Sequence, residues 1–266
     1  MKIWTVANQK GGVGKTTTTV SLGGLLASWG FRTLLLDIDP HGSLTSYFRY
    51  DPDAVENGVY SLFEGVMERR DVDPLGLVHP TGTEGLDLLP ASVALATLDR
   101  KAGRQEGMGL VLQRALERLG PHYDYALIDC PPMLGVLLIN ALAACRQLIV
   151  PVQTEFLALK GLERMQHTLK MVLRARRTPL PWTIVPTMYD RRTRASVDSL
   201  RVLRENHRDH LWSGVIPIDT KFREASRAGL PPAIYDPRAR GVRAYGALLE
   251  DLQGTADAGS GMRAAG

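Results

Sequence analysis

Residues 8–17 read NQKGGVGKTT and place three glycines, two lysines and two adjacent threonines in one short loop. Because the glycines lack a Cβ, the backbone can turn tightly there and aim its N–H groups inward at an anion. Lys15 opens the following helix and adds its charge to the positive end of the helix dipole. The Thr16 hydroxyl is a suitable Mg²⁺ ligand, so the loop predicts a site for nucleotide phosphates with Mg²⁺.

Two apolar runs deliver carboxylates that could complete such a site. Leu34-Leu35-Leu36 leads to Asp37 and Asp39, and residues 125–128 lead to Asp129. An aspartate at the end of an apolar strand holds Mg²⁺ directly or through water in nucleotide hydrolases, which is the role we expect for Asp129. Asp39 lies 24 residues beyond Lys15. Near the terminal phosphate it could orient water or hold Mg²⁺ through water.

The elements that would position these groups alternate along the chain as apolar strands and helical segments. This rhythm predicts an α/β fold, a single doubly wound, mostly parallel sheet with helices on both faces. Such sheets bind ligands at the carboxyl ends of their strands, where the loop and the aspartates fall. Shorter strands are expected at 76–78, 86–89 and 214–217, and a terminal helix at 241–252.

Composition bounds the class of protein. The 266 residues form one predicted domain, 1–252, followed by a Gly- and Ala-rich tail, 253–266, that we expect to be disordered. No apolar run has the length of a membrane span and no signal peptide precedes the first strand, so we expect a cytoplasmic protein. Cys130 and Cys145 form no CxxC pair, which argues against a disulfide framework or a zinc site.

The charge is unevenly distributed. From Lys160 to Tyr245 there are 18 Lys and Arg against 8 Asp and Glu, whereas the rest of the chain carries 14 against 20. This asymmetry favours a basic face for a polyanion, most simply nucleic acid, although solvated helix surfaces would give a similar count. No zinc finger or other base-reading module is present in the sequence, so contact would be with phosphates and independent of base sequence.

The loop KGGVGKTT resembles the deviant Walker A loop of the ParA/MinD group of P-loop ATPases, with Gln9 where the general pattern has glycine. Residues 37–43 are similar to the family's DxDPQGN segment, with His41 and Ser43 in place of Gln and Asn, and residues 129–132 match its D-x-P-P. The resemblance covers residues 3 to about 252. It implies ATP and Mg²⁺ as ligands and a homodimer in which Lys10 crosses to the partner's phosphates.

The resemblance implies specific roles for residues of this chain. The catalytic residues would be Lys10, Lys15 and Asp39. The nucleotide would be bound by Lys10, Gly11, Gly12, Val13, Gly14, Lys15, Thr16, Thr17, Pro217 and Asp219, and the metal by Thr16, Asp39 and Asp129. Residues 186–193 and 216–225 resemble two further family segments, in which the positions of Arg192 and Lys221 contribute to nonspecific DNA binding. Arg191, Arg194 and Arg223 belong to the same basic clusters.

The sequence therefore predicts a ParA/Soj-like ATPase whose ATP-bound dimer binds DNA and is released from it by ATP hydrolysis. We expect the protein to be associated with the nucleoid. A ParB-like or other adaptor would stimulate slow turnover. Segregation of a chromosome or plasmid is the first hypothesis for its function, and positioning of chemotaxis arrays or another protein cargo is the second. Two alternatives stay open, a metabolic P-loop enzyme such as a ligase or synthetase, and a MinD-type regulator at the membrane surface. The predicted tail has no apolar face that could insert into a bilayer, so we expect no membrane partner.

Overall fold

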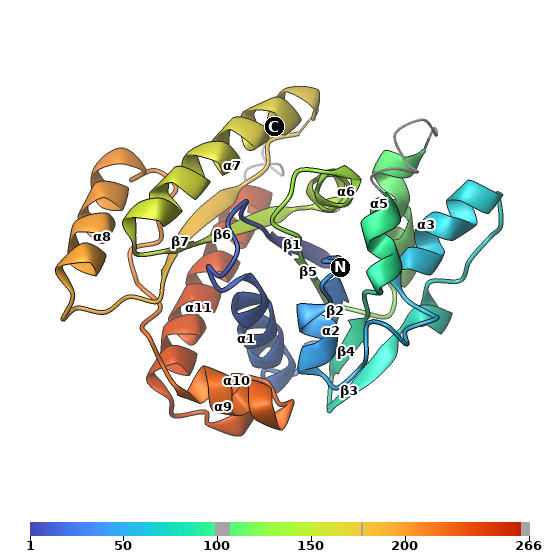
Figure 1. Ribbon diagram of the computed structural model, residues 1–266, viewed down its shortest axis with the longest axis horizontal. Coiled ribbons are helices and arrows are strands. Elements are labelled where there is room, and N and C mark those ends of the chain that lie inside the picture. Colours follow the sequence, from blue (N-terminus) through green and yellow to red (C-terminus); the bar gives the residue numbers. More distant parts are fainter. Residues whose placement is uncertain (99–106, 177, 262–266) are drawn as a thin grey trace.

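One sheet of seven strands lies at the centre of the computed structural model, which describes residues 1–98, 107–176 and 178–261 (Figure 1). Its strand order is β3-β4-β2-β5-β1-β6-β7, and every neighbouring pair is parallel except β3 with β4. The strands are β1 (Lys2–Val6), β2 (Thr33–Asp37), β3 (His79–Thr83), β4 (Leu86–Leu89), β5 (Tyr125–Asp129), β6 (Gln147–Gln153) and β7 (Trp182–Thr187). The predicted doubly wound, mostly parallel sheet is confirmed.

Helices cover both faces of this sheet (Figure 1). They are α1 (Lys15–Ser28), α2 (Ser43–Tyr47), α3 (Val59–Glu68), α5 (Val111–Leu119), α6 (Val136–Ala144), α7 (Phe156–Ala175), α8 (Arg194–Asn206), α9 (Lys221–Ala228), α10 (Pro232–Tyr235) and α11 (Arg240–Gly261). None of the helices within the described ranges combines the length and the apolar content that crossing a bilayer requires.

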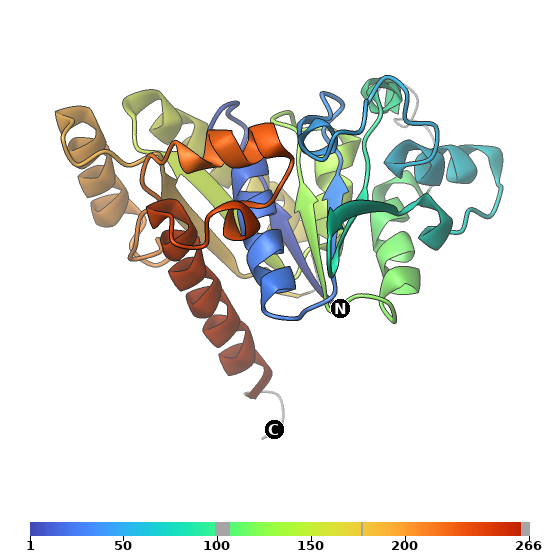
Figure 2. The same cartoon turned by 90° about the horizontal axis from the view of Figure 1, so that it is seen from below.

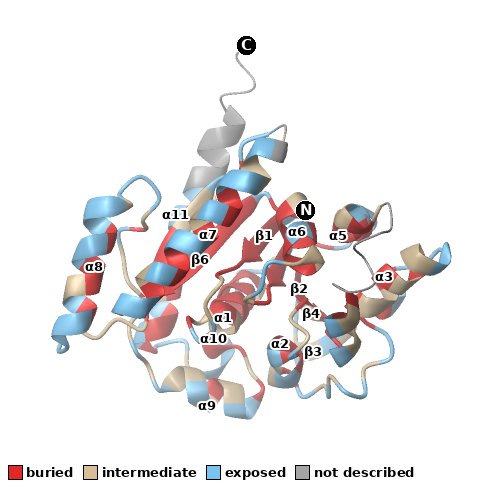
Figure 3. Cartoon of the chain, turned by 45° about the horizontal axis from the view of Figure 1, so that its top comes forward, coloured by how far each residue is buried: buried red, intermediate tan, exposed pale blue. Residues whose placement is uncertain are grey.

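The six strands other than β3 contribute side chains to two hydrophobic cores, because successive side chains of a strand point to opposite faces. Leu34 and Leu36 of β2 pack into a cluster that includes residues of α5, α6 and α7, whereas Leu35 packs with residues of α1 and α11. The strands and α1 accordingly appear as a continuous buried layer in Figure 3. Burial on both faces explains why the strands read as apolar runs without alternation.

Two predicted strands are wrong. Residues 76–78 overlap a 3₁₀ turn, Leu75–Leu77, and the outer strand is β3, which turns back onto β4 through Gly85 at φ +73°. Residues 214–217 form only an isolated bridge between Tyr189 and Pro217. Met188, at φ +52°, leaves the extended conformation between the end of β7 and Tyr189, which interrupts the strand that residues 214–217 would pair with. By contrast, the strand predicted at 86–89 is β4.

The last helix is longer than the sequence predicts. We expected a helix ending at Leu252 and a disordered tail from residue 253, but α11 continues to Gly261 and projects past the rest of the fold (Figure 2). An existing helix extends without a new nucleation step, adding one hydrogen bond for each residue. Residues 262–266 of the predicted tail lie outside the described residues.

The carboxyl ends of the central strands converge on one edge of the sheet. Val6 at the end of β1 pairs with Asp129 of β5, and Asp129 in turn pairs with Asp37 of β2. The loop that follows β1 therefore starts beside both carboxylates. On its other side lies β6, whose end leads to Glu155 at the start of α7. The strand register therefore brings the glycine loop and the predicted carboxylates together at one edge of the sheet.

The close contact between α1 and α10 gives a test of the packing. A Cβ on Gly24 would lie 2.3 Å from the Cβ of Pro231, so Gly24→Ala must push α10 away from α1. We expect the free energy of unfolding in urea to fall by about 1–3 kcal/mol. Gly246→Ala in α11 is the matched control, because a Cβ there meets no atom within 4 Å and should add up to about 1 kcal/mol. Equal stability of the two variants would contradict this packing.

Candidate functional site

The glycine loop adopts the backbone conformation that its sequence predicts. Gly12 and Gly14 have φ values of +74° and +90°, a region that residues with a Cβ rarely adopt. The Gly14 carbonyl accepts the N–H of Thr18 at 2.9 Å, which begins α1. Val13 is fully buried, and its carbonyl accepts a hydrogen bond from the Thr187 hydroxyl at 2.8 Å. The first N–H groups of α1 are thus presented at the loop, as an anion site requires.

The two lysines of the loop have different surroundings. Lys15 is 8% exposed, and its ammonium folds back to the carbonyl of Lys10 at 3.3 Å. Lys10 extends the other way and forms an ion pair with Glu155, the residue that precedes α7. The N–H of Lys10 donates to the side chain of Asn8, which itself donates to the Pro151 carbonyl of β6 at 2.8 Å. The main chain of the loop is therefore anchored on β6.

Asp129 lies directly beneath the start of α1. The Thr16 hydroxyl donates to its Oδ2 at 2.6 Å, while its buried Oδ1 has no hydrogen-bond partner within the described residues. Burial, followed by the nearby charge of Asp37, raises the pKa of Asp129 from 3.8 to about 8. A hydroxyl beside a carboxylate oxygen without a partner is a donor set of the hard oxygen ligands that Mg²⁺ prefers. The residues present thus fit the predicted metal.

Two further aspartates lie at the end of β2, Asp37 as its last residue and Asp39 just beyond it. Asp37 is fully buried and accepts the N–H and the hydroxyl of Thr45, each at 2.8 Å, and burial raises its pKa to about 6. It therefore anchors the loop between β2 and α2. The side chain of Asp39 is 14% exposed, and its Oδ1 accepts the backbone N–H of His41 at 3.0 Å. The imidazole Nδ1 of His41 lies 2.9 Å from the same oxygen. The structure brings Asp39 and Asp129 to the same edge as the loop.

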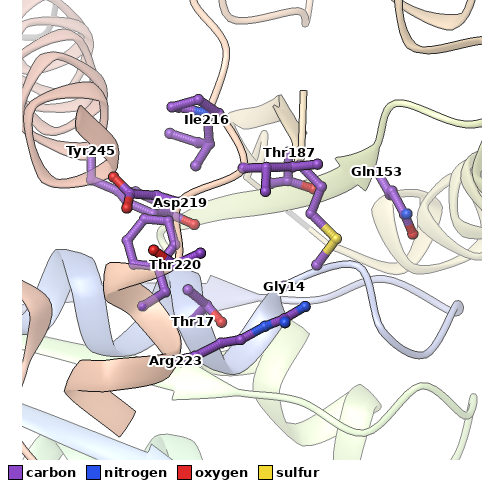
Figure 4. A pocket seen from close by; sticks show the side chains of 13 residues that line it. Gly14, Thr17, Gln153, Thr187, Ile216, Asp219, Thr220, Arg223 and Tyr245 are labelled. Atoms are coloured by element: carbon purple, nitrogen blue, oxygen red, sulfur yellow. The ribbon is translucent and has the colours of Figure 1, made fainter. Parts of the chain in front are cut away.

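A cavity of about 400 Å³ opens beside the loop (Figure 4). Gly14 and Thr17 lie on one side of it, and Pro217 and Asp219, which the resemblance implies as nucleotide contacts, lie on the other. Most of its wall is apolar, contributed by Met188, Ile216, Ile218, Phe222 and Tyr245. Such a wall suits the flat apolar face of a base.

Both carboxylate oxygens of Asp219 have structural partners. Its Oδ1 accepts the N–H of Lys221 at 3.0 Å and its Oδ2 accepts the N–H of Gly241 at 2.9 Å, which ties α9 to α11. Asp219 therefore shapes the cavity by holding the two helices that form its wall.

The basic residues predicted for DNA separate into two groups. Arg223 lines the cavity with Gly14 and Thr17, and Figure 4 shows its side chain beside Thr17. Arg191 and Arg192 instead line a second hollow of about 340 Å³, together with Arg240. Arg194 and Lys221 lie close by in sequence and are paired with Asp198 and Glu224 respectively.

Sequence reasoning missed several residues around the loop. Tyr245 is 1% exposed, shares a 2.8 Å hydrogen bond with Thr18 and lines the cavity, whereas the sequence placed it only within the terminal helix. Met188 also lines the cavity and has φ +52°, which no local pattern indicates. Glu155 could have been found, because it follows a strand that ends at the ligand edge of the sheet.

Comparisons with known proteins agree with this geometry. The AAA domain family matches residues 1–181. The sporulation initiation inhibitor protein Soj of Bacillus subtilis is 39% identical over 94% of this chain and 98% of its own length. The chromosome partitioning protein ParA of Caulobacter vibrioides is 35% identical over 95% and 94%. Cobyrinic acid a,c-diamide synthase of Mycobacterium smegmatis, solved with an ATP analogue and magnesium, has a TM-score of 0.83 and 33% identity over 97% of both chains.

A phosphate loop at the edge of a parallel sheet and the match over residues 1–181 define the class, and the chain belongs to the AAA domain family of P-loop ATPases. Its similarity to Soj and ParA over most of their length places it among the ParA/Soj partitioning ATPases. The resemblance inferred from the loop is confirmed.

The burial of Asp129 predicts how metal-free stability depends on pH. Because its folded pKa is raised above 3.8, the stability it contributes is complete below that value and is lost as pH rises through about 8. Asp129→Asn removes this charge, so the variant should gain roughly 1–3 kcal/mol relative to the wild type between pH 6 and pH 8. Urea unfolding in a chelator measures this change.

Asp124→Asn is the control for that experiment. Asp124 is paired with Arg32, which lowers its pKa, so its contribution is already complete at pH 6. The stability of this variant relative to the wild type should therefore stay constant between pH 6 and pH 8. If Asp129→Asn behaved in the same way, the assignment of a costly buried charge to Asp129 would be wrong.

Proposed function

We propose that this chain is an ATPase that partitions or positions a cargo by cycling between a monomer and an ATP-bound homodimer that binds DNA without sequence preference. The observation that carries the proposal is the glycine loop with its two lysines, bordered by exposed apolar side chains on both neighbouring connections. Similarity to Soj and ParA supports the same cycle.

The nucleotide is ATP, held by residues 10–17. The N–H groups of Gly11 to Gly14 and the start of α1 face the phosphates, and Lys15 neutralises their charge. Pro217 and the wall around Asp219 receive the base and ribose. Thr16, Asp129 and, through water, Asp39 would hold Mg²⁺, which would help to neutralise the charge of the phosphates. The magnesium and ATP analogue of the Mycobacterium synthase support these ligands.

Hydrolysis uses three side chains. Asp39 positions the attacking water, since it lies at the edge of the sheet with one carboxylate oxygen fixed by His41. Lys15, and Lys10 supplied by the partner, stabilise the charge that develops on the transferred phosphoryl group. Turnover is slow because a monomer places only one of these two lysines at its own nucleotide. An adaptor protein stimulates ATP hydrolysis.

The dimer face lies around the phosphate loop. Among the described residues, the three most exposed large apolar side chains are Met133 at 72%, Phe156 at 69% and Leu157 at 65%. Met133 follows β5 and the other two begin α7 after β6, and these strands are the two neighbours of β1. Apolar side chains on both sides of Lys10 favour a second copy as their cover, since burying them is favourable in water.

The two loop lysines give separable phenotypes. Lys15→Ala should lose ATP binding by at least about tenfold, since the phosphate charge is no longer neutralised. Lys10→Ala should keep ATP binding but remain monomeric, because its ammonium serves the other subunit. Fluorescent-ATP titration and light scattering measure the two properties. Dimerisation of Lys10→Ala at wild-type concentrations would contradict the shared site.

DNA binding is assigned to the hollow of about 340 Å³ between the end of β7 and the start of α11. Arg191, Arg192 and Arg240 surround it, and Arg194 and Lys221 extend the basic surface. Arg192 is 83% exposed and paired with Asp190, so its guanidinium is already oriented outward by a partner that a phosphate can replace. Arg223, which we first assigned to DNA, is proposed instead to contact the nucleotide.

Reversal of one charge tests the DNA surface. Arg192→Glu should weaken binding of the ATP-bound dimer to duplex DNA about tenfold or more and lower the salt dependence by about one or two released ions. Arg114→Glu is the control, because Arg114 is exposed on α5 and the change in net charge is the same. Gel shifts across salt concentrations that treat both variants alike would contradict a localised DNA site.

The cargo follows from the relatives. Segregation of chromosome or plasmid DNA through a ParB-like adaptor is the first candidate, because the similar ParA proteins of Myxococcus xanthus and Caulobacter vibrioides are chromosome partitioning proteins. Positioning of a chemotaxis array or another protein cargo uses the same cycle with a different adaptor. Pull-down of the adaptor from the native organism with the ATP-bound dimer separates these two.

A metabolic synthetase is the second candidate function, favoured by the 33% identity with cobyrinic acid a,c-diamide synthase. In such an enzyme ATP would activate a small carboxylic acid. The two functions differ in what accelerates ATP hydrolysis: duplex DNA and an adaptor in one case, a small acid with an amide donor in the other. Binding of the ATP form to liposomes and not to DNA would instead favour a membrane-surface regulator.

A further inference from the structure

Lys10 is held in place by its own chain. Its ammonium pairs with the carboxylate of Glu155, and the two side chains are 25% and 40% exposed. Glu155 lies between β6 and α7, so the contact connects the phosphate loop with a helix that starts one residue later. The part of Lys10 between backbone and ammonium passes along α7.

Gly161 makes room for that passage. A Cβ at this position of α7 would lie 2.9 Å from the Cβ of Lys10 and 3.7 Å from its Cδ. Gly161 is buried in a helix of 20 residues, where glycine is unfavourable relative to alanine. The close approach of Lys10 is the physical reason for glycine here. Gly161 and Glu155 therefore act together as a seat for the lysine.

The seat fixes the lysine from its backbone outward. The N–H of Lys10 donates to Asn8 and its carbonyl accepts the ammonium of Lys15, so the main chain has partners on both sides. Movement of Lys10 towards another molecule must then occur in the side chain, and it must break the contact with Glu155.

We propose that Glu155 is a positioning residue that holds Lys10 within its own subunit and thereby opposes dimerisation until ATP phosphates of a second copy replace the carboxylate. This inference rests on the proposed function, in which Lys10 serves the partner's nucleotide. Both competitors are anions that accept hydrogen bonds from an ammonium. The phosphates carry more charge, so ATP in the partner shifts Lys10 across and an empty partner leaves it on Glu155.

Glu155→Gln tests the proposal. The substitution keeps the size of the side chain and removes its charge. Lys10 can then move to the partner's phosphates without breaking an ion pair in its own subunit. The protein concentration at which half the chains dimerise with a nonhydrolysable ATP analogue should fall about two- to fivefold, as expected for a partly exposed ion pair. The affinity of the monomer for the analogue and the unfolding temperature should stay as in the wild type. Analytical ultracentrifugation gives the midpoint.

Two further variants isolate the cause. Glu163→Gln on the exposed side of α7 removes a glutamate that pairs with Lys160 and should leave the midpoint unchanged. Gly161→Ala should lower the midpoint as Glu155→Gln does, because its Cβ displaces Lys10 from the seat.

The outcomes separate the proposal from the function on which it rests. If the wild type fails to dimerise with the analogue, the proposed cycle is wrong. If the wild type dimerises but Glu155→Gln leaves the midpoint unchanged or raises it, the cycle stands and the positioning role of Glu155 is overturned. A fall in unfolding temperature with an unchanged midpoint would likewise assign Glu155 to structure alone.

Discussion

Burial of the Asp129 carboxylate beneath the phosphate loop is the constraint on which the rest of the site depends. Desolvation penalises its charge, and the neighbouring Asp37 adds repulsion, while Thr16 supplies one compensating hydrogen bond. Charges buried in this way are usually paired or bound to a metal. The fold tolerates the cost because β1, β2 and β5 hold both carboxylates in register with the loop. Binding of a cation at this site and ionisation of Asp129 are therefore linked.

The sequence predicted the parts of the site that short-range patterns encode. The glycines at positive φ, Lys15, Thr16 and the two aspartates after apolar strands all lie where their spacing indicated. It could not predict that Arg223 faces the cavity, because the direction of a side chain on α9 depends on how that helix docks against α10 and α11. The contact of Lys10 with Glu155 joins residues 145 apart, which no local pattern reveals.

The fold was predicted with similar limits. Central strands were recognised because burial on both faces makes them continuous apolar runs. The outer strand β3 was not, since it contains a proline and a glycine and carries no fully buried residue. The segment 214–217 was apolar enough for a strand, but its partner segment leaves the extended conformation at Met188, so only a single bridge forms. Edges of a sheet depend more on partners than on their own sequence, which is why errors gathered there.

Similarity to both partitioning proteins and a synthase shows how a shared phosphate site accommodates different roles. The loop, the aspartates and the cavity are common requirements of nucleotide chemistry, whereas the arginines at the end of β7 and the apolar side chains beside Lys10 lie outside that cavity. Function in this class is decided by such surfaces.

The hydrogen bond between Thr18 and Tyr245 joins residues 227 positions apart and closes the cavity from the side of α11. During synthesis the ribosome delivers the phosphate loop first and this tyrosine near the end. A nascent chain can therefore form the central strands long before the base side of its pocket has a wall. The order of translation thus delays completion of the cavity until α11 has emerged.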